Sequence, residues 1–358
     1  MHRRSFLLAA PVALAAGKFR LCLAGLAHGH ARGFLNTLLK RTDVSLAGIA
    51  EPDASLHARY GSAFQLPPDT FHTSLASLLD TVKPDAVAVF SSTFDHRSAV
   101  EQCARRRIPV MMEKPLAVSR EHALAMRDAA AKPGIPVLVN YETTWYRSHA
   151  LLRREIESAA FGPIRKMAAM DGHQGPKEIG VGPEFLAWLT DPVKNGAGAL
   201  FDFGCYGANL MTWLMNNRRP DAVTARTATF KPRIYPRVDD EAAILVDYPG
   251  AQGIIQGSWN WPYSRKDLEV YAANGYAHAN GGNRLRLLRP KTKEEEIVSP
   301  PELPPDERDP VSCLMAAVQG RLKPAGLSSL ENNLIVTDIL VAARESARTG
   351  RTVALAPA

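Results

Sequence analysis

The strongest constraint on the fold is an alternation of short apolar runs with amphipathic stretches across residues 18–140. Strands are predicted for the apolar runs at 19–26, 44–50, 85–90, 109–112 and 136–140. Helices are predicted for the stretches between them, at 31–39, 54–60, 74–81, 95–106 and 119–130. Apolar strands that alternate with helices imply a parallel sheet covered on both faces. We therefore predict an α/β N-terminal domain with a doubly wound parallel sheet, the fold that binds dinucleotides.

The pattern changes after residue 141. A helix is predicted at 149–158, followed by longer β-like runs at 222–230, 241–248, 252–259 and 268–273. Such runs indicate an α+β second domain with a large, mostly antiparallel open sheet. We expect residues 18–140 to bind the dinucleotide and 141–358 to serve substrate binding and oligomerisation, with a C-terminal helix at 327–349 packing back on the first domain. An open sheet face is covered by a partner subunit, so a homodimer or homotetramer is expected.

Composition excludes several classes of protein. The chain has 358 residues and a net charge of +7, but its basic residues are dispersed, and a nucleic-acid surface would need a basic stripe interleaved with aromatics. No run of eighteen apolar residues occurs, so no membrane span is expected. The four cysteines are far apart and show no CxxC spacing, which argues against both zinc and a disulfide framework.

The N-terminus has the parts of an export signal. Arg3-Arg4-Ser5-Phe6-Leu7 is similar to a twin-arginine signal, an apolar run follows, and Ala13-Leu14-Ala15 provides a small-x-small cleavage site. We expect residues 1–17 to direct the protein to the periplasm or beyond. The alternative is a basic N-terminus on a cytoplasmic enzyme.

The turn after the first predicted strand is the expected phosphate-binding turn, and it departs from the usual Gly-x-Gly-x-x-Gly. Its cofactor-binding residues are predicted to be Gly25, Ala27, His28, Gly29 and His30, with Ala27 and His30 where the second and third glycines belong. Helix N-termini hold phosphates whatever the side chains. Glu51 ends the second strand, where an acidic residue commonly takes the ribose hydroxyls, so NAD is favoured over NADP.

His28 and His30 also raise the question of a metal. Two histidines with one residue between them hold a metal only when other ligands converge on them. We therefore interpret them as turn residues beside the cofactor and expect no metal.

Polar residues follow three further strands, at the sheet edge where ligands bind. The predicted cofactor-binding residues there are Ser91, Ser92, Thr93, His96, Glu113, Lys114, Pro115 and Asn140. A lysine directly after a buried strand is unusual unless it points into a cleft, where its pKa can fall and it can polarise or pass a proton.

These residues resemble a known family. Glu113-Lys114-Pro115, Gly25 after the first strand and the Thr93-x-x-His96 turn are similar to those of the glucose–fructose oxidoreductase, inositol dehydrogenase and rhizopine-catabolism family. The block 196–209, with Asp202-x-Gly204-x-Tyr206-x-x-Asn209, resembles the Gly-rich block of its second domain, and residues 345–351 resemble its closing helix. The resemblance covers nearly the whole chain after the signal.

The resemblance implies a catalytic set of Lys114, Asp202 and Tyr206 around the nicotinamide, and tyrosine in place of histidine is similar to the branch that includes periplasmic glucose–fructose oxidoreductase. Positions 202, 206 and 209 are spaced to line one helix face. A tyrosine is a poor base unless a nearby cation, here Lys114, favours its phenolate. With Lys114, Asp202 and Tyr206, the predicted substrate residues are Tyr141, Trp145, His173 and Asn209.

Two features leave the substrate open. The run Tyr141-Glu142-Thr143-Thr144-Trp145-Tyr146 stands where the family typically carries an Asn-x-Arg-Phe-like segment. Trp259 and Trp261 either stack on a sugar ring or pack a sheet edge.

The sequence thus predicts an exported oxidoreductase that transfers hydride between a tightly bound NAD(P) and a carbon of a sugar or polyol. One alternative is an NAD-dependent glycoside hydrolase that oxidises C3 transiently, eliminates, adds water and re-reduces. Another is a regulator that binds dinucleotide and sugar without turnover.

Overall fold

The computed structural model describes residues 17–355, in which the apolar runs of the N-terminal part form a parallel sheet of order β3-β2-β1-β4-β5-β6. Its strands are β1 (Phe19–Ala24), β2 (Val44–Ala50), β3 (Phe71–His72), β4 (Ala86–Val89), β5 (Val110–Glu113) and β6 (Val137–Asn140). Its helices are α1 (Ala31–Leu38), α2 (Ala54–Phe64), α3 (Leu75–Val82), α4 (His96–Arg105) and α5 (Arg120–Ala131). This order confirms the predicted doubly wound fold. The sequence pattern missed only β3, which is two residues long.

Alternation along β1 divides the core between the two faces of this sheet. Leu21 and Leu23 pack in one cluster with α1 and with α10 (Pro310–Val318), whereas Cys22 packs on the opposite face with α3, α4 and α5. A helix from the C-terminal part of the chain therefore helps to cover the dinucleotide domain.

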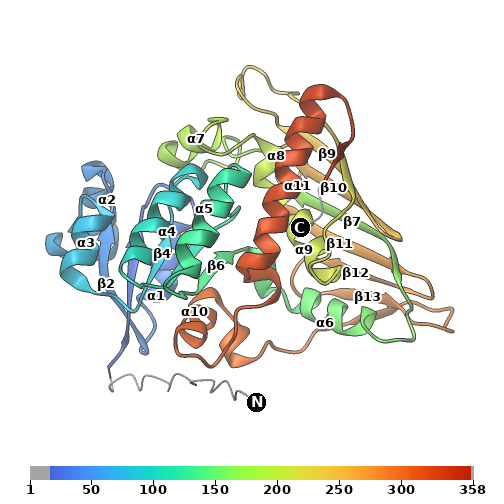
Figure 1. The fold of residues 1–358 in the computed structure, drawn as a ribbon, viewed down its shortest axis with the longest axis horizontal. Coiled ribbons are helices and arrows are strands. Elements are labelled where there is room, and N and C mark those ends of the chain that lie inside the picture. The colour runs from blue at the N-terminus through green and yellow to red at the C-terminus, as the bar shows by residue number, and fades with distance from the viewer. Residues whose placement is uncertain (1–16, 356–358) are drawn as a thin grey trace, which may run out of the picture.

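The second sheet has the order β14-β13-β12-β11-β7-β10-β9-β8-β15 and lies beside the first (Figure 1). Its strands are β7 (Ile164–Gly172), β8 (Ala222–Ala228), β9 (Glu241–Tyr248), β10 (Ala251–Ser258), β11 (Arg265–Ala272), β12 (Tyr276–Asn280), β13 (Leu285–Leu288), β14 (Glu296–Val298) and β15 (Val353–Ala354). The pairing is mostly antiparallel, as predicted, and β7 pairs with β10 in parallel. The other helices are α6 (Arg147–Ile156), α7 (Pro183–Leu189), α8 (Ala199–Asp202), α9 (Gly204–Leu214) and α11 (Leu330–Thr349). Short 3-10 helices are η1 (Pro68–Thr70), η2 (Thr93–Asp95), η3 (Glu142–Trp145), η4 (Pro305–Glu307) and η5 (Gly326–Ser328).

One face of the second sheet carries helices and the other is open. Strand β9 alternates buried and exposed residues, and Leu245 on β9 and Ile254 on β10 are 39% and 48% exposed. Apolar side chains on an open sheet face suit a partner surface.

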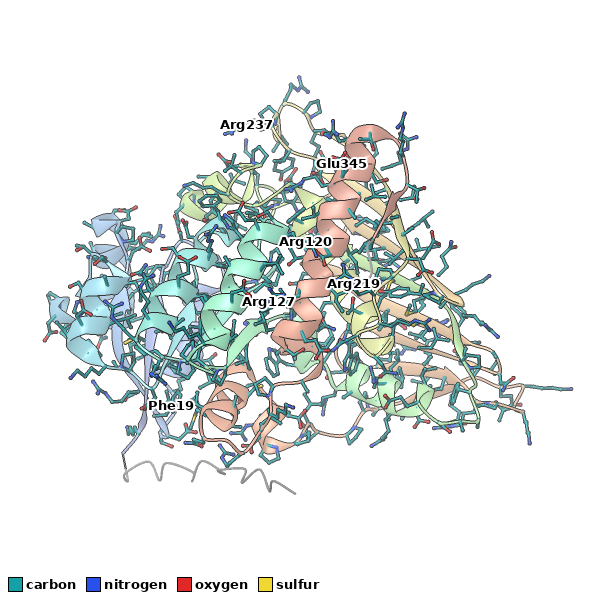
Figure 2. All side chains as sticks on the ribbon, viewed as in Figure 1. Phe19, Arg120, Arg127, Arg219, Arg237 and Glu345 are labelled. Atoms are coloured by element: carbon teal, nitrogen blue, oxygen red, sulfur yellow. The ribbon has the colours of Figure 1, made fainter. Side chains whose placement is uncertain are left out.

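Helix α11 ties the two parts together. It runs between α5 of the first part and α9 of the second (Figure 1). Its Asp338 forms ion pairs with Arg120 of α5 and with Arg219, and both arginines lie beside the helix in Figure 2. Arg344 donates hydrogen bonds to the carbonyls of Val118 and Gly196, one on each side. The cleft between the domains is thereby held in one arrangement.

The predicted export signal lies, except for Gly17, outside the described residues. Among residues 17–355, no helix has the length and apolar character needed to cross a membrane.

Candidate active site

Lys114 and Asp202 meet at the junction of the two domains. Lys114 directly follows β5, and Asp202 ends α8. The Lys114 Nζ donates to Asp202 Oδ1 at 2.5 Å and to the Asp202 carbonyl at 2.9 Å, and both side chains are 6% exposed. Trp259 Nε1 donates to the second carboxylate oxygen, Oδ2, at 2.9 Å. The carboxylate is therefore fixed by one group from each domain, Lys114 from the first and Trp259 from the second.

The local sequence explains how Asp202 is held against Lys114. Asp239 accepts hydrogen bonds from the backbone N–H groups of Gly198 (2.9 Å) and Leu200 (2.7 Å), which fixes the start of α8. A Cβ on Gly198 would lie 1.8 Å from the Asp239 carbonyl oxygen, so only glycine allows this approach. The Gly-rich block thus positions the short helix that carries Asp202.

Charge pairing sets the protonation of these two groups. Burial alone would lower the pKa of Lys114, but Asp202 outweighs burial and the pKa is raised. Burial alone would raise the pKa of Asp202, but the Lys114 ammonium and its hydrogen bond lower it. The buried carboxylate partner thus keeps Lys114 in its charged form, and the fall in pKa that burial alone would cause does not occur.

Tyr206, in α9, lies next to this pair, and two lysines lie close to its ring. Lys114 Nζ is 5.1 Å from the ring centroid and Lys266 Nζ is 5.3 Å away. Tyr141, directly after β6, packs edge-on against the ring at 5.5 Å between centroids. Burial raises the pKa of Tyr206 well above its ordinary value, and the nearby Glu142 adds to the effect. The raised pKa runs against the predicted phenolate: Lys114 lies over the ring, and the neutral phenol, which can donate a proton, is favoured.

Asn209 does not join the substrate side. Its amide nitrogen donates to the Leu327 carbonyl and to Asn332 Oδ1, and the side chain is fully buried against α11. The one-face prediction fails because the helix is interrupted: α8 ends at Asp202 and α9 begins at Gly204. We correct Asn209 to a packing residue between helices.

The phosphate turn depends on one glycine. Gly25 has φ +88°, and a Cβ there would lie 2.8 Å from the Ser91 backbone nitrogen, so the ends of β1 and β4 meet only with glycine in place. The turn is covered from the second domain, where Trp188 Nε1 donates to the Ala27 carbonyl at 3.3 Å and Phe185 packs against His28. An ion pair between Arg59 of α2 and Glu184 of α7 holds that cover in place.

A cavity of about 270 Å³ lies between the turn and α7. It is lined by the predicted cofactor residues Gly25, Ala27, Glu51, Ser91 and Ser92, together with Pro52, Asp95, Glu184, Ala187, Trp188, Asp191 and Lys194. The Glu51 carboxylate accepts hydrogen bonds from the backbone nitrogens of Leu26 (2.6 Å) and Asp53 (2.9 Å). Glu51 thus shapes the turn as well as facing the cavity.

His28, His30 and Glu113 come together on the other side of the turn. Their potential ligand atoms lie within 4.8 Å of one another, the one group of this kind among the described residues. However, His28 Nδ1 accepts the backbone N–H of His30 at 3.1 Å, and His30 Nδ1 lies 3.1 Å from Glu113 Oε2. The structure accounts for these side chains by hydrogen bonds to each other, and our expectation of no metal stays a prediction.

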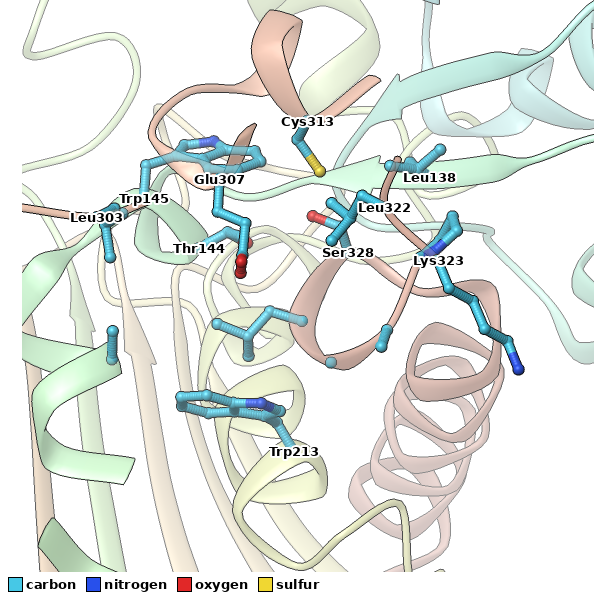
Figure 3. Close-up of a pocket in the computed structure, with 15 residues that line it drawn as sticks. Leu138, Thr144, Trp145, Trp213, Leu303, Glu307, Cys313, Leu322, Lys323 and Ser328 are labelled. Carbon is cyan, nitrogen blue, oxygen red and sulfur yellow. The ribbon is translucent and has the colours of Figure 1, made fainter. Parts of the chain in front are cut away.

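Glu113 continues into a chain of hydrogen bonds that ends at a tryptophan. Asn140 Nδ2 donates to Glu113 Oε1 at 2.8 Å, and Trp145 Nε1 donates to Asn140 Oδ1 at 2.9 Å. Glu113, Asn140, His30 and Gly29 line a second cavity of about 420 Å³, which also includes Glu142 and Trp145. The other side of Trp145 borders a separate, more enclosed cavity with Trp213 and Cys313 (Figure 3).

Thr93 and His96 are buried and do not line either cofactor-side cavity. Both are 1% exposed. His96 Nδ1 lies 3.2 Å from the Leu116 carbonyl, and burial lowers its pKa to about 4. With the cis peptide between Lys114 and Pro115, these residues shape the loop that presents Lys114. Thr93 and His96 thus pack beneath the predicted cofactor site and do not line it.

His173 lies at the second-domain edge of the site. It packs edge-on against Phe203 at 4.9 Å, and burial lowers its pKa, which leaves it neutral. Its Nδ1 accepts the Gly175 backbone N–H at 2.9 Å, so the neutral ring carries its proton on Nε2. His173 can therefore donate a hydrogen bond to a ligand.

The structure brings to the site several groups whose role the sequence does not reveal, namely Glu142, Lys194 and Lys266, and it gives Trp259 a partner in Asp202. Lys266 stands in the run Arg265-Lys266-Asp267, which matches no motif and resembles an ordinary exposed strand start. Trp259 was noted for its aromatic character, but nothing in its spacing pointed to Asp202.

Comparison with known proteins identifies the class. Residues 19–141 match the family described as "Oxidoreductase family, NAD-binding Rossmann fold", and residues 149–278 match the "GFO/IDH/MocA C-terminal domain". The two matches cover both domains in the expected order. The chain belongs to the GFO/IDH/MocA family of NAD-binding oxidoreductases, which confirms the resemblance.

Similar sequences carry the names of sugar and polyol dehydrogenases. A D-apiose dehydrogenase of Rhizobium rhizogenes is 24% identical over 288 residues, which span 75% of this chain and 79% of that protein. Inositol 2-dehydrogenase 2 of Saccharopolyspora erythraea is 30% identical over 239 residues, 66% of this chain and 62% of that protein.

Solved structures show the same fold over nearly the whole chain. An inositol dehydrogenase homolog from Azotobacter vinelandii, complexed with NAD+, superimposes with a TM-score of 0.81 at 17% identity, covering 97% of this chain and 100% of that one. An aldose-aldose oxidoreductase from Caulobacter crescentus, complexed with glycerol, gives a TM-score of 0.79 at 20% identity, covering 95% and 100%.

Proposed function

We propose that this protein transfers hydride between a nicotinamide dinucleotide and a CH–OH carbon of a sugar or polyol, in the cleft where Lys114, Asp202 and Tyr206 meet. The observation that carries the proposal is the buried Lys114–Asp202 pair beside a neutral Tyr206. The relatives named as sugar and polyol dehydrogenases support the substrate class.

Each of the three groups has a distinct part. The Lys114 ammonium binds the oxygen of the reacting carbon and stabilises the negative charge that develops there. Asp202 keeps Lys114 charged and oriented. Tyr206, as a neutral phenol, donates a proton to a carbonyl oxygen during reduction, and its deprotonated form receives that proton in the reverse direction.

The residues of the first domain fit a dinucleotide. The close approach at Gly25 leaves a cavity beside the turn, and Glu51 and Lys194 line it. When bound, the nicotinamide ring accepts or supplies the hydride. Glu51 favours NAD over NADP because a carboxylate there repels a 2′-phosphate.

The remaining parts of the proposal concern location and assembly. The twin-arginine-like N-terminus supports export to the periplasm, where free NAD is scarce, so the cofactor is held tightly and recycled by a second substrate. The cover that α7 places over the turn suits slow release. The open sheet face with Leu245 and Ile254 supports a homodimer or homotetramer.

The test begins with the protein as purified. Mass spectrometry of released ligand should find NAD, and addition of aldoses or inositols one at a time should produce the absorbance of reduced nicotinamide. A protein that carries no nucleotide and requires micromolar-to-millimolar added NAD would contradict tight binding. Hydrolysis of chromogenic glycosides that needs NAD but yields no net NADH would favour the glycoside hydrolase, and nucleotide binding without any turnover would favour the regulator.

A further inference from the structure

A second charged pair, Lys266 and Glu142, lies beside Tyr206. Glu142 of η3, from the segment after the last strand of the first sheet, accepts a hydrogen bond from Lys266 Nζ of β11 at 2.6 Å. The Tyr146 hydroxyl donates to the other Glu142 oxygen, Oε1, at 2.5 Å. Lys266 also lies 5.3 Å from the Tyr206 ring centroid. The pair therefore adjoins the proposed proton donor directly.

Glu142, the acidic member of this pair, faces a cavity that a ligand can enter. The Glu142 side chain is 48% exposed and lines the cavity of about 420 Å³ together with His30, Glu113 and Trp145. Glu142 is half exposed, so solvent screens its ion pair with Lys266 and weakens the contribution of the pair to folding. Lys266 supplies hydrogen-bond donors and Glu142 supplies acceptors, and a hydroxyl group both donates and accepts.

The charges around the cleft are balanced pair by pair. Lys114 faces Asp202, Lys266 faces Glu142, and His30 faces Glu113. Asp171 is buried behind Lys266, and burial raises its pKa well above the ordinary value, which leaves it neutral. Both lysines of the site thus already have a carboxylate partner, and a substrate carboxylate or phosphate would compete with that partner.

We propose that Glu142 and Lys266 together bind hydroxyl groups next to the reacting carbon and select a neutral polyhydroxy substrate over a sugar acid or sugar phosphate. This inference rests on the proposed function, since it names the substrate class of the same site. Glu142 and Lys266 are specificity-determining residues in it, whereas Lys114 and Tyr206 act at the reacting carbon.

The experiment compares Glu142→Gln and Lys266→Met with the wild-type protein. Substrates are the best aldose from a panel, its deoxy analogues and the aldonic acid of the same carbon skeleton. Each variant should raise KM for the aldose about ten- to hundred-fold, the cost of losing a hydrogen bond to a charged group, while kcat changes less than about threefold. The deoxy analogue that lacks the bound hydroxyl should lose affinity in the wild type but show little further loss in the variants.

The acid substrate gives the two variants opposite signatures. Glu142→Gln leaves Lys266 without its carboxylate, so the ratio of kcat/KM for the aldonic acid to that for the aldose should rise at least about tenfold. Lys266→Met removes the cation, so that ratio should stay at or below the wild-type value. Glu295→Gln is the matched control, because it breaks an ion pair with Arg286 on β13 and should leave both substrates unchanged. Lys266→Arg should keep the preference for the neutral aldose.

The outcomes separate this inference from the proposed function. If neither the wild type nor the control oxidises any polyol, the proposed function fails. If both turn over polyols and Glu142→Gln keeps the wild-type KM and acid-to-aldose ratio, the inference on Glu142 and Lys266 is overturned. A wild-type protein that prefers the aldonic acid overturns it without any variant.

Discussion

The ends of β5 and β1 lie in one cleft but are built by different means. At the end of β5, Lys114 is fixed by side-chain partners. Its ammonium pairs with the Asp202 carboxylate, and Trp259 donates a hydrogen bond to the same carboxylate. At the end of β1, the turn is fixed by backbone geometry at Gly25 and by aromatic side chains of α7 that cover it. The first arrangement suits a group that handles charge during a reaction, and the second suits a surface that cradles a cofactor.

Replacement of Lys114 should have the largest effect and should separate the two regions. Lys114→Met should lower kcat/KM for the polyol about 10³-fold or more, because it removes the group that stabilises charge on the reacting oxygen. The affinity for NAD should change only a few-fold, as measured by quenching of tryptophan fluorescence. Equal losses in turnover and in NAD affinity would mean that the two strand ends do not have separate tasks.

Replacement of Tyr206 tests the proton donor. Tyr206→Phe should lower kcat about 10²-fold with KM nearly unchanged. Because the pKa of Tyr206 is raised, the phenol stays protonated, and the wild-type reduction rate should not fall between about pH 8 and pH 10. A steep fall in the reduction rate across that range would mean that Tyr206 loses its proton there, and the phenolate interpretation would then hold.

Glu113 lies between the two regions, and its charge should contribute to stability. Burial alone would raise its pKa, but His30 and Asn140 lower it from 4.5 to about 2. A carboxylate with a lowered pKa stabilises the folded state at pH values above its pKa in the unfolded chain. This stabilisation is lost as the pH falls towards the pKa in the folded protein. Glu113→Gln should therefore cost about 3 kcal/mol of unfolding free energy at neutral pH. Urea unfolding should show that the difference in free energy of unfolding between the wild type and Glu113→Gln becomes smaller below about pH 4.5.

The control for Glu113 is Glu121→Gln. Glu121 is 80% exposed and paired with Arg97, so its loss should cost less than about 1 kcal/mol at any pH. If the loss of unfolding free energy caused by Glu113→Gln does not change with pH, the substitution acts through packing and not through the charge of Glu113.

The smallest expected effect belongs to the backbone of the turn. Gly25→Ala should destabilise the fold by about 1–3 kcal/mol and weaken NAD binding, because φ is +88° and the new Cβ meets Ser91. Gly61→Ala, in α2, where a Cβ would meet its neighbours only at ordinary contact distance (3.5 Å), is the matched control and should stabilise the protein by up to about 1 kcal/mol. Thermal unfolding of the two variants, with and without NAD, measures both the stability of the fold and the binding of NAD. Equal behaviour of the two variants would contradict the role given to the turn.

The sequence predicted the elements whose signal is local. Apolar runs that alternate with amphipathic stretches placed the first domain, and the motif at Glu113-Lys114-Pro115 placed the lysine at a strand end. Glu142, Lys266 and Trp259 reach the cleft from distant segments, and their residue types are ordinary where they stand. Only the three-dimensional packing of β10, β11 and η3 reveals their part.

Two predictions failed for identifiable reasons. Asn209 was placed on the substrate side because the phase of one continuous helix was assumed, and the break at Phe203 changes that phase. The phenolate expected for Tyr206 runs against the raised pKa of its phenol, because the sequence does not show that Lys114 lies over the ring.

The central claim is that Lys114 and Asp202 act as one catalytic unit. A double-mutant cycle tests it, with kcat/KM for the best polyol measured in Lys114→Met, Asp202→Asn and the double variant, all first shown to bind NAD. We expect the double variant to lose no more kcat/KM than the worse single variant, because either change already disables the pair. Losses that add in full, so that each residue acts regardless of the other, would contradict it.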